Sequence, residues 1–128
     1  MKHAALVLSV TLGALAMPSA ASAHHSAAAT YDATQSIPIT GTVAVFAWRN
    51  PHSHLYIEVT EGPYKGKEYV IELSSPVVLE EVGWSRTSFK AGDRVTVYVN
   101  PSRAGAPIGL CRNCLVTVNG VTKPRTVE

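Results

Sequence analysis

Hydrophobic and polar side chains alternate along several short stretches of this chain, with the period of two that is typical of β-strands. The alternation is cleanest over residues 54–60, where every second side chain is apolar, and it returns over residues 94–99. Residues 37–48 are rich in β-branched residues, which favour strands, and Gly41 within them is expected to mark a bulge or a bend. Further strands are predicted at residues 68–73 and 114–118. The pattern therefore predicts five short strands.

A single short helix is predicted between the third and fourth strands. Ser75 suits the N-cap, Pro76 the first helical position and Gly83 the C-terminal cap. Residues 100–109 are rich in proline and glycine and are expected to form a long loop. Three strands, a helix and two more strands is the order of an OB-fold. We therefore expect an all-β protein, a small five-stranded OB-like Greek-key barrel over residues 37–121, with a plain antiparallel sandwich as the alternative.

The N-terminal residues 1–23 have the organisation of a cleavable signal peptide. Lys2 precedes an uncharged apolar run at residues 4–17, and Ala21-Ser22-Ala23 has the small-x-small pattern of a cleavage site. The run is shorter than the roughly 20 residues of a membrane-spanning helix, and an uncleaved anchor is the alternative. We expect a secreted, periplasmic protein without stable membrane insertion after processing. Its parts would be an arm at residues 24–36, the barrel, and a polar tail at residues 122–128.

Composition and charge narrow the function mainly by exclusion. Eleven Lys and Arg side chains against nine Asp and Glu give a net charge of +2, without the basic run or face that nucleic-acid binding favours. The chain has no G-x-S-x-G nucleophile elbow and no glycine-rich phosphate loop, so we do not expect an enzyme. The scattered carboxylates are expected on solvated faces; they are Glu58, Glu72, Glu80 and Glu81.

The histidines of the processed chain form two clusters, His24-His25 and His52-x-His54. His52 and His54 lie two positions apart, so on an extended strand both side chains project from the same face. Cleavage after Ala23 would give His24 a free α-amino group beside its imidazole, and these two nitrogens can chelate one ion. An imidazole from the second cluster would complete the three-nitrogen arrangement called a histidine brace.

These nitrogen ligands predict a metal-binding protein, with copper favoured over zinc. The metal ligands would be His24, His25, His52 and His54. The alternative is that both clusters are polar surface and that the protein is a non-metal OB-type module, which binds a small ligand or an exported protein. Its contact residues would be Trp48, Tyr56 and Trp84. Oxygen chemistry would require an open position on a brace copper.

The two cysteines form a C-x-x-C motif, Cys111 and Cys114, followed by Leu115 where a c-type haem site has histidine. In an oxidising compartment a disulfide closing a turn at Asn113 is one interpretation. A redox-active pair and a thiolate metal pair are the other two. The pairing requires a turn, because positions three apart on a continuous strand point to opposite faces.

Several landmarks of the sequence occur together and in order. They are Ala23-His24-His25-Ser26, Gly41-Thr42-Val43, Trp48-Arg49-Asn50-Pro51-His52, Ile71-Glu72-Leu73-Ser74-Ser75-Pro76, Leu79, Gly83-Trp84 and Lys90-Ala91-Gly92-Asp93-Arg94-Val95. In these the chain resembles an uncharacterised family of small exported bacterial proteins, a domain of unknown function, over almost the whole processed chain. The resemblance implies a periplasmic small β-barrel and brings no activity or substrate. Its histidines match His24, His25 and His52, whereas Ala27 replaces an aromatic and the cysteine pair lies outside the family pattern.

Overall fold

The computed structural model describes residues 27–126, and most of its regular elements are strands. In chain order the elements are α1 (Ala27–Thr30), β1 (Ile37–Ala47), β2 (His54–Val59), β3 (Glu68–Glu72), α2 (Pro76–Glu81), β4 (Arg94–Pro101), β5 (Ile108–Leu110), β6 (Val116–Val118) and β7 (Val121–Thr122). No helix in this part of the chain is both long enough and apolar enough to cross a membrane.

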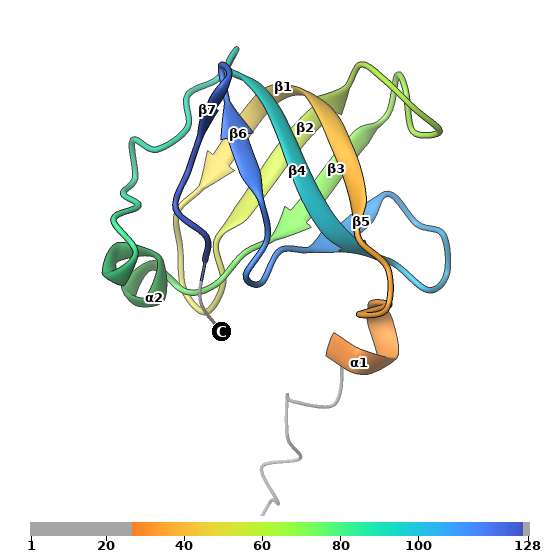
Figure 1. Cartoon of the computed structure of the whole chain (residues 1–128), viewed down its shortest axis with the longest axis horizontal. Coiled ribbons are helices and arrows are strands. Elements are labelled where there is room, and N and C mark those ends of the chain that lie inside the picture. Colours follow the sequence, from red (N-terminus) through yellow and green to blue (C-terminus); the bar gives the residue numbers. More distant parts are fainter. Residues whose placement is uncertain (1–26, 127–128) are drawn as a thin grey trace, which may run out of the picture.

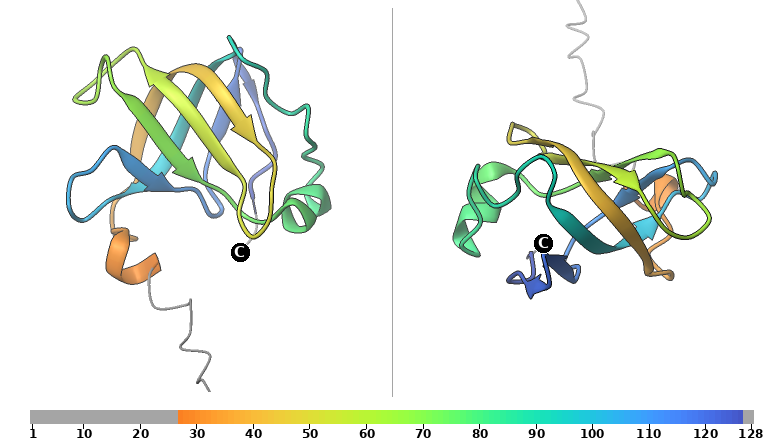
Figure 2. Two further views of the ribbon diagram at one scale, coloured as in Figure 1. Left: turned by 180° about the vertical axis from the view of Figure 1, so that it is seen from behind. Right: turned by 90° about the horizontal axis from the view of Figure 1, so that it is seen from above.

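Five of the strands close into a barrel (Figures 1 and 2). The antiparallel meander β1–β2–β3 forms one wall. The barrel closes because β1 also pairs with β4, while β5 lies between β3 and β4, parallel to the first and antiparallel to the second. With α2 between β3 and β4, this is the connectivity of an OB-fold. The prediction of an all-β, five-stranded barrel is confirmed.

The strand that completes the barrel differs from the one predicted. It is β5, which begins inside the predicted loop at residues 100–109, while residues 116–118 form β6 and pair with another part of β4. A three-residue strand is too short to show a period of two. Its central residue, Gly109, is required by space, because a Cβ there would lie 2.6 Å from Cγ2 of Val99.

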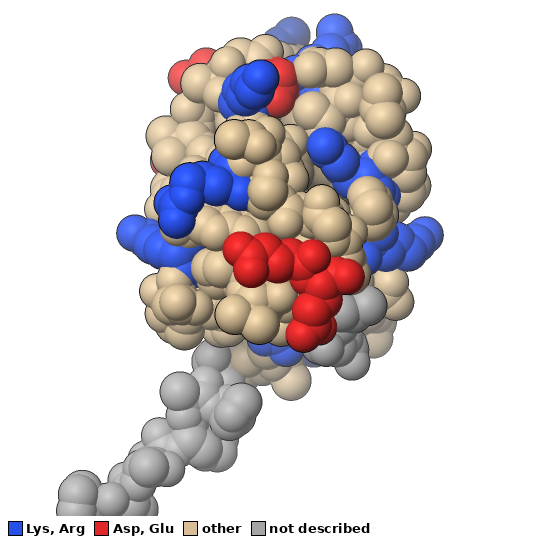
Figure 3. All heavy atoms as spheres, turned by 90° about the vertical axis from the view of Figure 1, so that its left-hand side faces the viewer, with Lys and Arg blue, Asp and Glu red and all other residues tan. Residues whose placement is uncertain are grey.

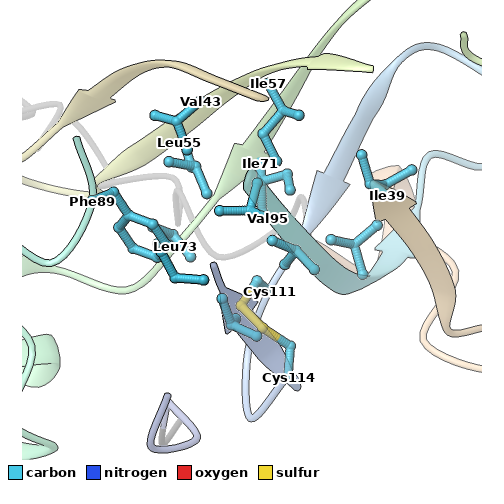
Figure 4. Packing of buried hydrophobic residues seen from close by; sticks show 14 of the residues in the cluster. Ile39, Val43, Leu55, Ile57, Ile71, Leu73, Phe89, Val95, Cys111 and Cys114 are labelled. Atoms are coloured by element: carbon cyan, nitrogen blue, oxygen red, sulfur yellow. A yellow bond between two sulfur atoms is a disulfide. The ribbon is translucent and has the colours of Figure 1, made fainter. Parts of the chain in front are cut away.

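The last strand of the barrel is thus divided by a large bulge. Between the paired positions of β5 and β6 lie five residues, 111–115, whereas only two residues of β4, 98 and 99, lie between their partners. The excess chain forms a turn in which Asn113 has a positive φ of 51°. A disulfide between Cys111 and Cys114 closes this turn, and both half-cystines belong to the hydrophobic core (Figure 4).

The barrel interior is filled by the alternate side chains of its strands, as the sequence pattern predicts for β2 and β4. Leu55 and Ile57 of β2, Ile71 of β3, and Val95 and Val97 of β4 are each at most 1% exposed. Figure 4 shows these strands contributing to one packed cluster. The intervening side chains therefore project outward, where a binding site can form.

The helix α2 begins as the sequence predicts, with Ser75 at the N-cap and Pro76 in the first turn. Its C-cap is Val82 rather than Gly83, and Gly83 follows with φ 82°. The amide of Gly83 donates to the Glu80 carbonyl and the next amide to the Leu79 carbonyl, which is a Schellman motif. Glycine suits this position because it adopts the left-handed conformation without steric cost.

Residues 122–126, the described part of the predicted polar tail, fold back onto the barrel. The segment begins with β7, the indole Nε1 of Trp84 donates to the Pro124 carbonyl at 3.0 Å, and Thr126 is fully buried. Packing of this segment against Trp84 was not evident from its polar sequence, because the contact joins positions forty residues apart.

Candidate functional site

The His52-x-His54 pair lies where the chain enters β2. Between the two histidines, Ser53 is fully buried, its amide donates to the Ser74 carbonyl and its carbonyl accepts from the Leu73 amide. These bonds extend the β2–β3 ladder by one residue, so this stretch is extended and its burial alternates. Both imidazoles therefore share the outer face of the barrel, at its β2–β3 side.

Glu72 is the centre of the polar contacts on this face. It is the Cα partner of His54 across the β2–β3 ladder. Nδ1 of His52 lies 2.9 Å from its Oε1, which is the diagonal contact expected for a residue two positions from the direct partner. The hydroxyl of Tyr31 donates to its Oε2 at 3.1 Å. One carboxylate therefore joins a histidine at the start of β2 to a tyrosine of the N-terminal arm.

The arm that carries Tyr31 is docked on the barrel. Tyr31 forms an isolated β-bridge with Ser102, and the amide of Asp32 donates to the Pro101 carbonyl. Nε of Arg103 donates to the carbonyl of Ala28 in α1. In Figure 1, α1 lies at the end of the barrel formed by β4 and β5. The described part of the arm is therefore a packed element.

The environment of Tyr31 favours its neutral form. Burial, with the negative charge of Glu72 and the hydrogen bond to it, raises the pKa of Tyr31 to about 12. Burial likewise raises the pKa of Tyr69, whose hydroxyl donates to the Ile108 carbonyl at 2.8 Å. The two tyrosines stabilise the β3–β5 region through these hydrogen bonds, Tyr31 from outside the barrel and Tyr69 from its core.

Replacing Tyr31 with phenylalanine should loosen the arm. The variant loses a hydrogen bond to a carboxylate, a contribution of about 1.5–3 kcal/mol, so the Asp32 amide should exchange its hydrogen faster. Because folding raises the tyrosine pKa from 10.0 to about 12, the stabilisation is complete below the lower value and is lost as pH rises through the higher one. Spectrophotometric titration should show one late-ionising tyrosine fewer in the variant than in the parent, because Tyr69 ionises late in both. Identical exchange and titration curves would contradict the assignment.

The structure brings together only part of the predicted metal site. His52 and His54 share one face, whereas His24 and His25 lie outside the described residues. Within residues 27–126, no group of three or more His, Cys, Asp or Glu side chains is arranged to hold a metal. The cysteines are joined as a disulfide, so neither is a free thiolate.

Two residues of the site, Glu72 and Tyr31, were not singled out by the sequence. Glu72 was expected on a solvated face, yet its side chain is only 23% exposed and accepts two contacts. Prediction of the pairing register between β2 and β3 would have placed Glu72 beside His54. Nothing local indicates Tyr31, because its contact depends on how the arm folds back.

The aromatic residues of the predicted ligand face separate into different environments. Trp84 is 2% exposed and packs edge-on against Phe89, so it belongs to the core. Trp48 is half-buried against Phe46. Only Tyr56 projects from β2 on the same side as His54. Trp84 therefore does not lie on the outer face beside Tyr56, because its ring is packed against Phe89 and the C-terminal segment.

A closed OB-type barrel with a histidine–carboxylate–tyrosine chain on its outer face defines a small all-β protein with a polar site at the β2–β3 wall. The model of the Family of unknown function (DUF6152) matches residues 12–112, and the chain belongs to this family. Neither the curated proteins nor the solved structures include a significant match to this chain.

Proposed function

We propose that this protein binds copper in the periplasm, using the processed N-terminus at His24 together with His52 and His54 of the barrel. His25 is a further available ligand. The observation that carries the proposal is the pair of contacts from Tyr31 to Glu72 and from Glu72 to His52. They connect the arm, which follows the N-terminal histidines in the sequence, to the histidine pair of the barrel.

The contact of His52 with Glu72 prepares this imidazole to bind a metal. A histidine ligand commonly donates its second ring N–H to a carboxylate, which sets the tautomer and raises the basicity of the ligating nitrogen. With Nδ1 on Oε1 of Glu72, the Nε2 atom is the free ligand atom. The side chain of His52 is 39% exposed, so an ion can approach it.

His54 has a buried ring nitrogen that lacks a protein partner. Its Nδ1 atom is inaccessible and makes no hydrogen bond within residues 27–126. A buried polar atom without a partner costs free energy, and a ring flip that turned this nitrogen outward to a metal ion would remove that cost. His54 also lies directly opposite Glu72, so both imidazoles are neighbours of one carboxylate.

The position of Ala27, the first described residue of the arm, supports the proposal, because only a short stretch of chain joins it to His24. Leu110 pairs with Glu72, which pairs with His54, so these three positions form one row across β5, β3 and β2. With strands about 4.8 Å apart, the row is about 10 Å long. Ala27 lines a small pocket with Leu110. His24 is three positions before Ala27, and three residue steps can span about 11 Å when extended, which is comparable to the length of the row.

Copper fits this ligand set better than zinc. Amine and imidazole nitrogens suit copper(II), which also binds such sites most tightly among divalent first-row metals. A structural zinc site would normally close with four protein ligands, often including thiolates, and the two cysteines are already joined. Sequestration or transfer of the ion is the function that such a site supports.

The proposal is tested by titrating copper(II) into the processed protein beginning at His24 and into a form with one alanine added before it. The extension turns the amine into an amide, so the affinity should fall by about 100-fold or more, that is about 2.7 kcal/mol. Glu72→Gln should weaken binding about 10–100-fold through His52. Glu68→Gln is the matched control, because it removes the same charge from an exposed position of the same strand. Equal affinities of the extended and processed forms would contradict the brace, and absence of binding in both would end the metal proposal.

A second candidate, a non-metal binding module, is favoured by one observation. A pocket of about 400 Å³ opens between the start of β1 and the β2–β3 turn, and its lining is mostly apolar. Ile37, Ile39, Pro63 and Tyr64 supply the apolar surface. This size and character suit a small apolar ligand, in a place separate from the predicted aromatic face.

A further inference from the structure

A second polar pocket lies beside the disulfide turn. It has a volume of about 250 Å³ and is bounded by β4, the turn and the C-terminal segment. Arg112 reaches it from the turn and Arg125 from the C-terminal segment, while Tyr98 and Asn100 line it from β4. Two arginines thirteen positions apart in the sequence therefore line one hollow.

Neither arginine is neutralised within the described part of the chain. The ion pairs among residues 27–126 are His52–Glu72, Arg94–Glu61 and Arg103–Asp32, and no acidic side chain lines this pocket. Figure 3 shows acidic side chains gathered over α2, the helix that carries Glu80 and Glu81. Like charges brought into one hollow without a counter-charge repel each other, and a bound anion would relieve that repulsion.

The pocket is held in shape by bonds that do not involve a ligand. Nη1 of Arg125 donates to the carbonyl of Asn113 at 3.0 Å, and Asn113 lies within the turn that the disulfide closes. Nδ2 of Asn100 donates to the Gln35 carbonyl at 2.7 Å, which anchors this wall to the arm. This bond uses one of the five N–H donors of the Arg125 guanidinium, and the other donors can face a ligand.

We propose that this pocket binds the oxyanion group of a small organic ligand, a carboxylate or a phosphate. Guanidinium groups recognise both by paired, charge-assisted hydrogen bonds. Tyr98, which is 39% exposed, adds a phenol hydroxyl, and Leu115 adds an apolar wall for the body of the ligand. The volume exceeds that of a bare anion and suits a molecule of a few carbon atoms.

The proposal also gives the C-x-x-C motif a function. The disulfide defines the bulge between β5 and β6, and that bulge carries Arg112 and the carbonyl that positions Arg125. The disulfide would thus hold an anion site in shape, at a place separate from the histidine face. Success or failure of copper binding leaves this inference untouched.

The test is an NMR titration of the purified protein at low ionic strength with inorganic phosphate and, separately, with succinate. We expect saturable shifts of the Arg112 and Asn113 amide signals with at least one probe, and the responding probe identifies the oxyanion class. Arg112→Gln and Arg125→Gln should each weaken binding about tenfold. Raising the salt concentration should weaken it further.

The matched control is Arg49→Gln, which removes the same charge from an exposed position outside the pocket. Unchanged binding in this control, with loss in both pocket variants, supports a specific site. The proposal is overturned if neither probe gives a saturable shift, if either pocket variant binds as the parent does, or if the control loses as much affinity. Matching thermal melts of the variants establish that any loss is local.

Discussion

Replacing Gly41 with alanine should lower the free energy of unfolding by about 3 kcal/mol or more, the upper range for forcing atoms into a packed interior. Gly41 pairs with Val59 of β2 and with Val95 of β4, so both ladders of the barrel pass through it. A Cβ there would overlap the Glu58 carbonyl oxygen and lie 2.7 Å from Cγ2 of Ile57. Backbone atoms of β2 would have to move. Denaturant-induced unfolding, followed by circular dichroism, measures the loss.

Gly105→Ala is the control for this substitution. A Cβ at Gly105 would meet no atom within 4 Å, and only its left-handed backbone opposes the change, which costs about 1–2 kcal/mol. A clearly larger loss at Gly41 is expected. Equal losses at the two positions would show that the close approach of β2 is not what requires glycine at position 41.

Replacing Trp84 with alanine should lower the free energy of unfolding by about 3–5 kcal/mol, the range for deleting a large buried aromatic. Trp84 is 2% exposed, packs edge-on against Phe89 and donates its indole N–H to the Pro124 carbonyl. Its removal would leave a cavity at the end of α2 and detach the C-terminal segment. Calorimetric and denaturant unfolding measure the effect.

Two further variants separate the contributions at this position. Trp84→Phe keeps most of the ring volume and loses the hydrogen bond, so a loss of about 1 kcal/mol from that bond is expected, with a small packing term. Trp48→Ala removes an indole of the same size from a half-buried position, and its cost should be clearly smaller than that of Trp84→Ala. Similar costs for both tryptophans would contradict the role of Trp84 as the anchor of the C-terminal segment.

Most of the barrel could be predicted from local patterns, because four of its strands are long enough to show alternation or β-branched enrichment. The α2 helix was equally accessible from its serine, proline and glycine signals. The fifth strand was not, because β5 has three residues with a glycine at its centre and finds its partners only through tertiary pairing. The turn at 111–115 also interrupts the periodicity of the last strand.

The candidate site divides in the same way. The shared face of His52 and His54 follows from the period of a strand and required no knowledge of the fold. Glu72 depends on the register between β2 and β3, and Tyr31 depends on the return of the arm to β4 and β5. Neither relation leaves a signal near the residue in the sequence. The sequence left open whether Trp84 faces a ligand or the core, because exposure, unlike periodicity, is a property of the assembled core.

The pairing of β1 with β4 has a consequence for how the chain acquires its shape. Ile37 pairs with Val99 between β1 and β4, and Glu72 pairs with Leu110 between β3 and β5. These two strand pairings, which close the barrel, connect early positions of the chain with late ones. A chain that emerges N-terminus first from a ribosome or a pore can form its β1–β2–β3 meander early. The apolar face of this meander is then still exposed to water. Closure of the barrel must wait until residue 110 has appeared. Folding is therefore expected to be slow and to finish largely after synthesis. The partly formed barrel, with its apolar face exposed, is expected to be the species most prone to aggregation.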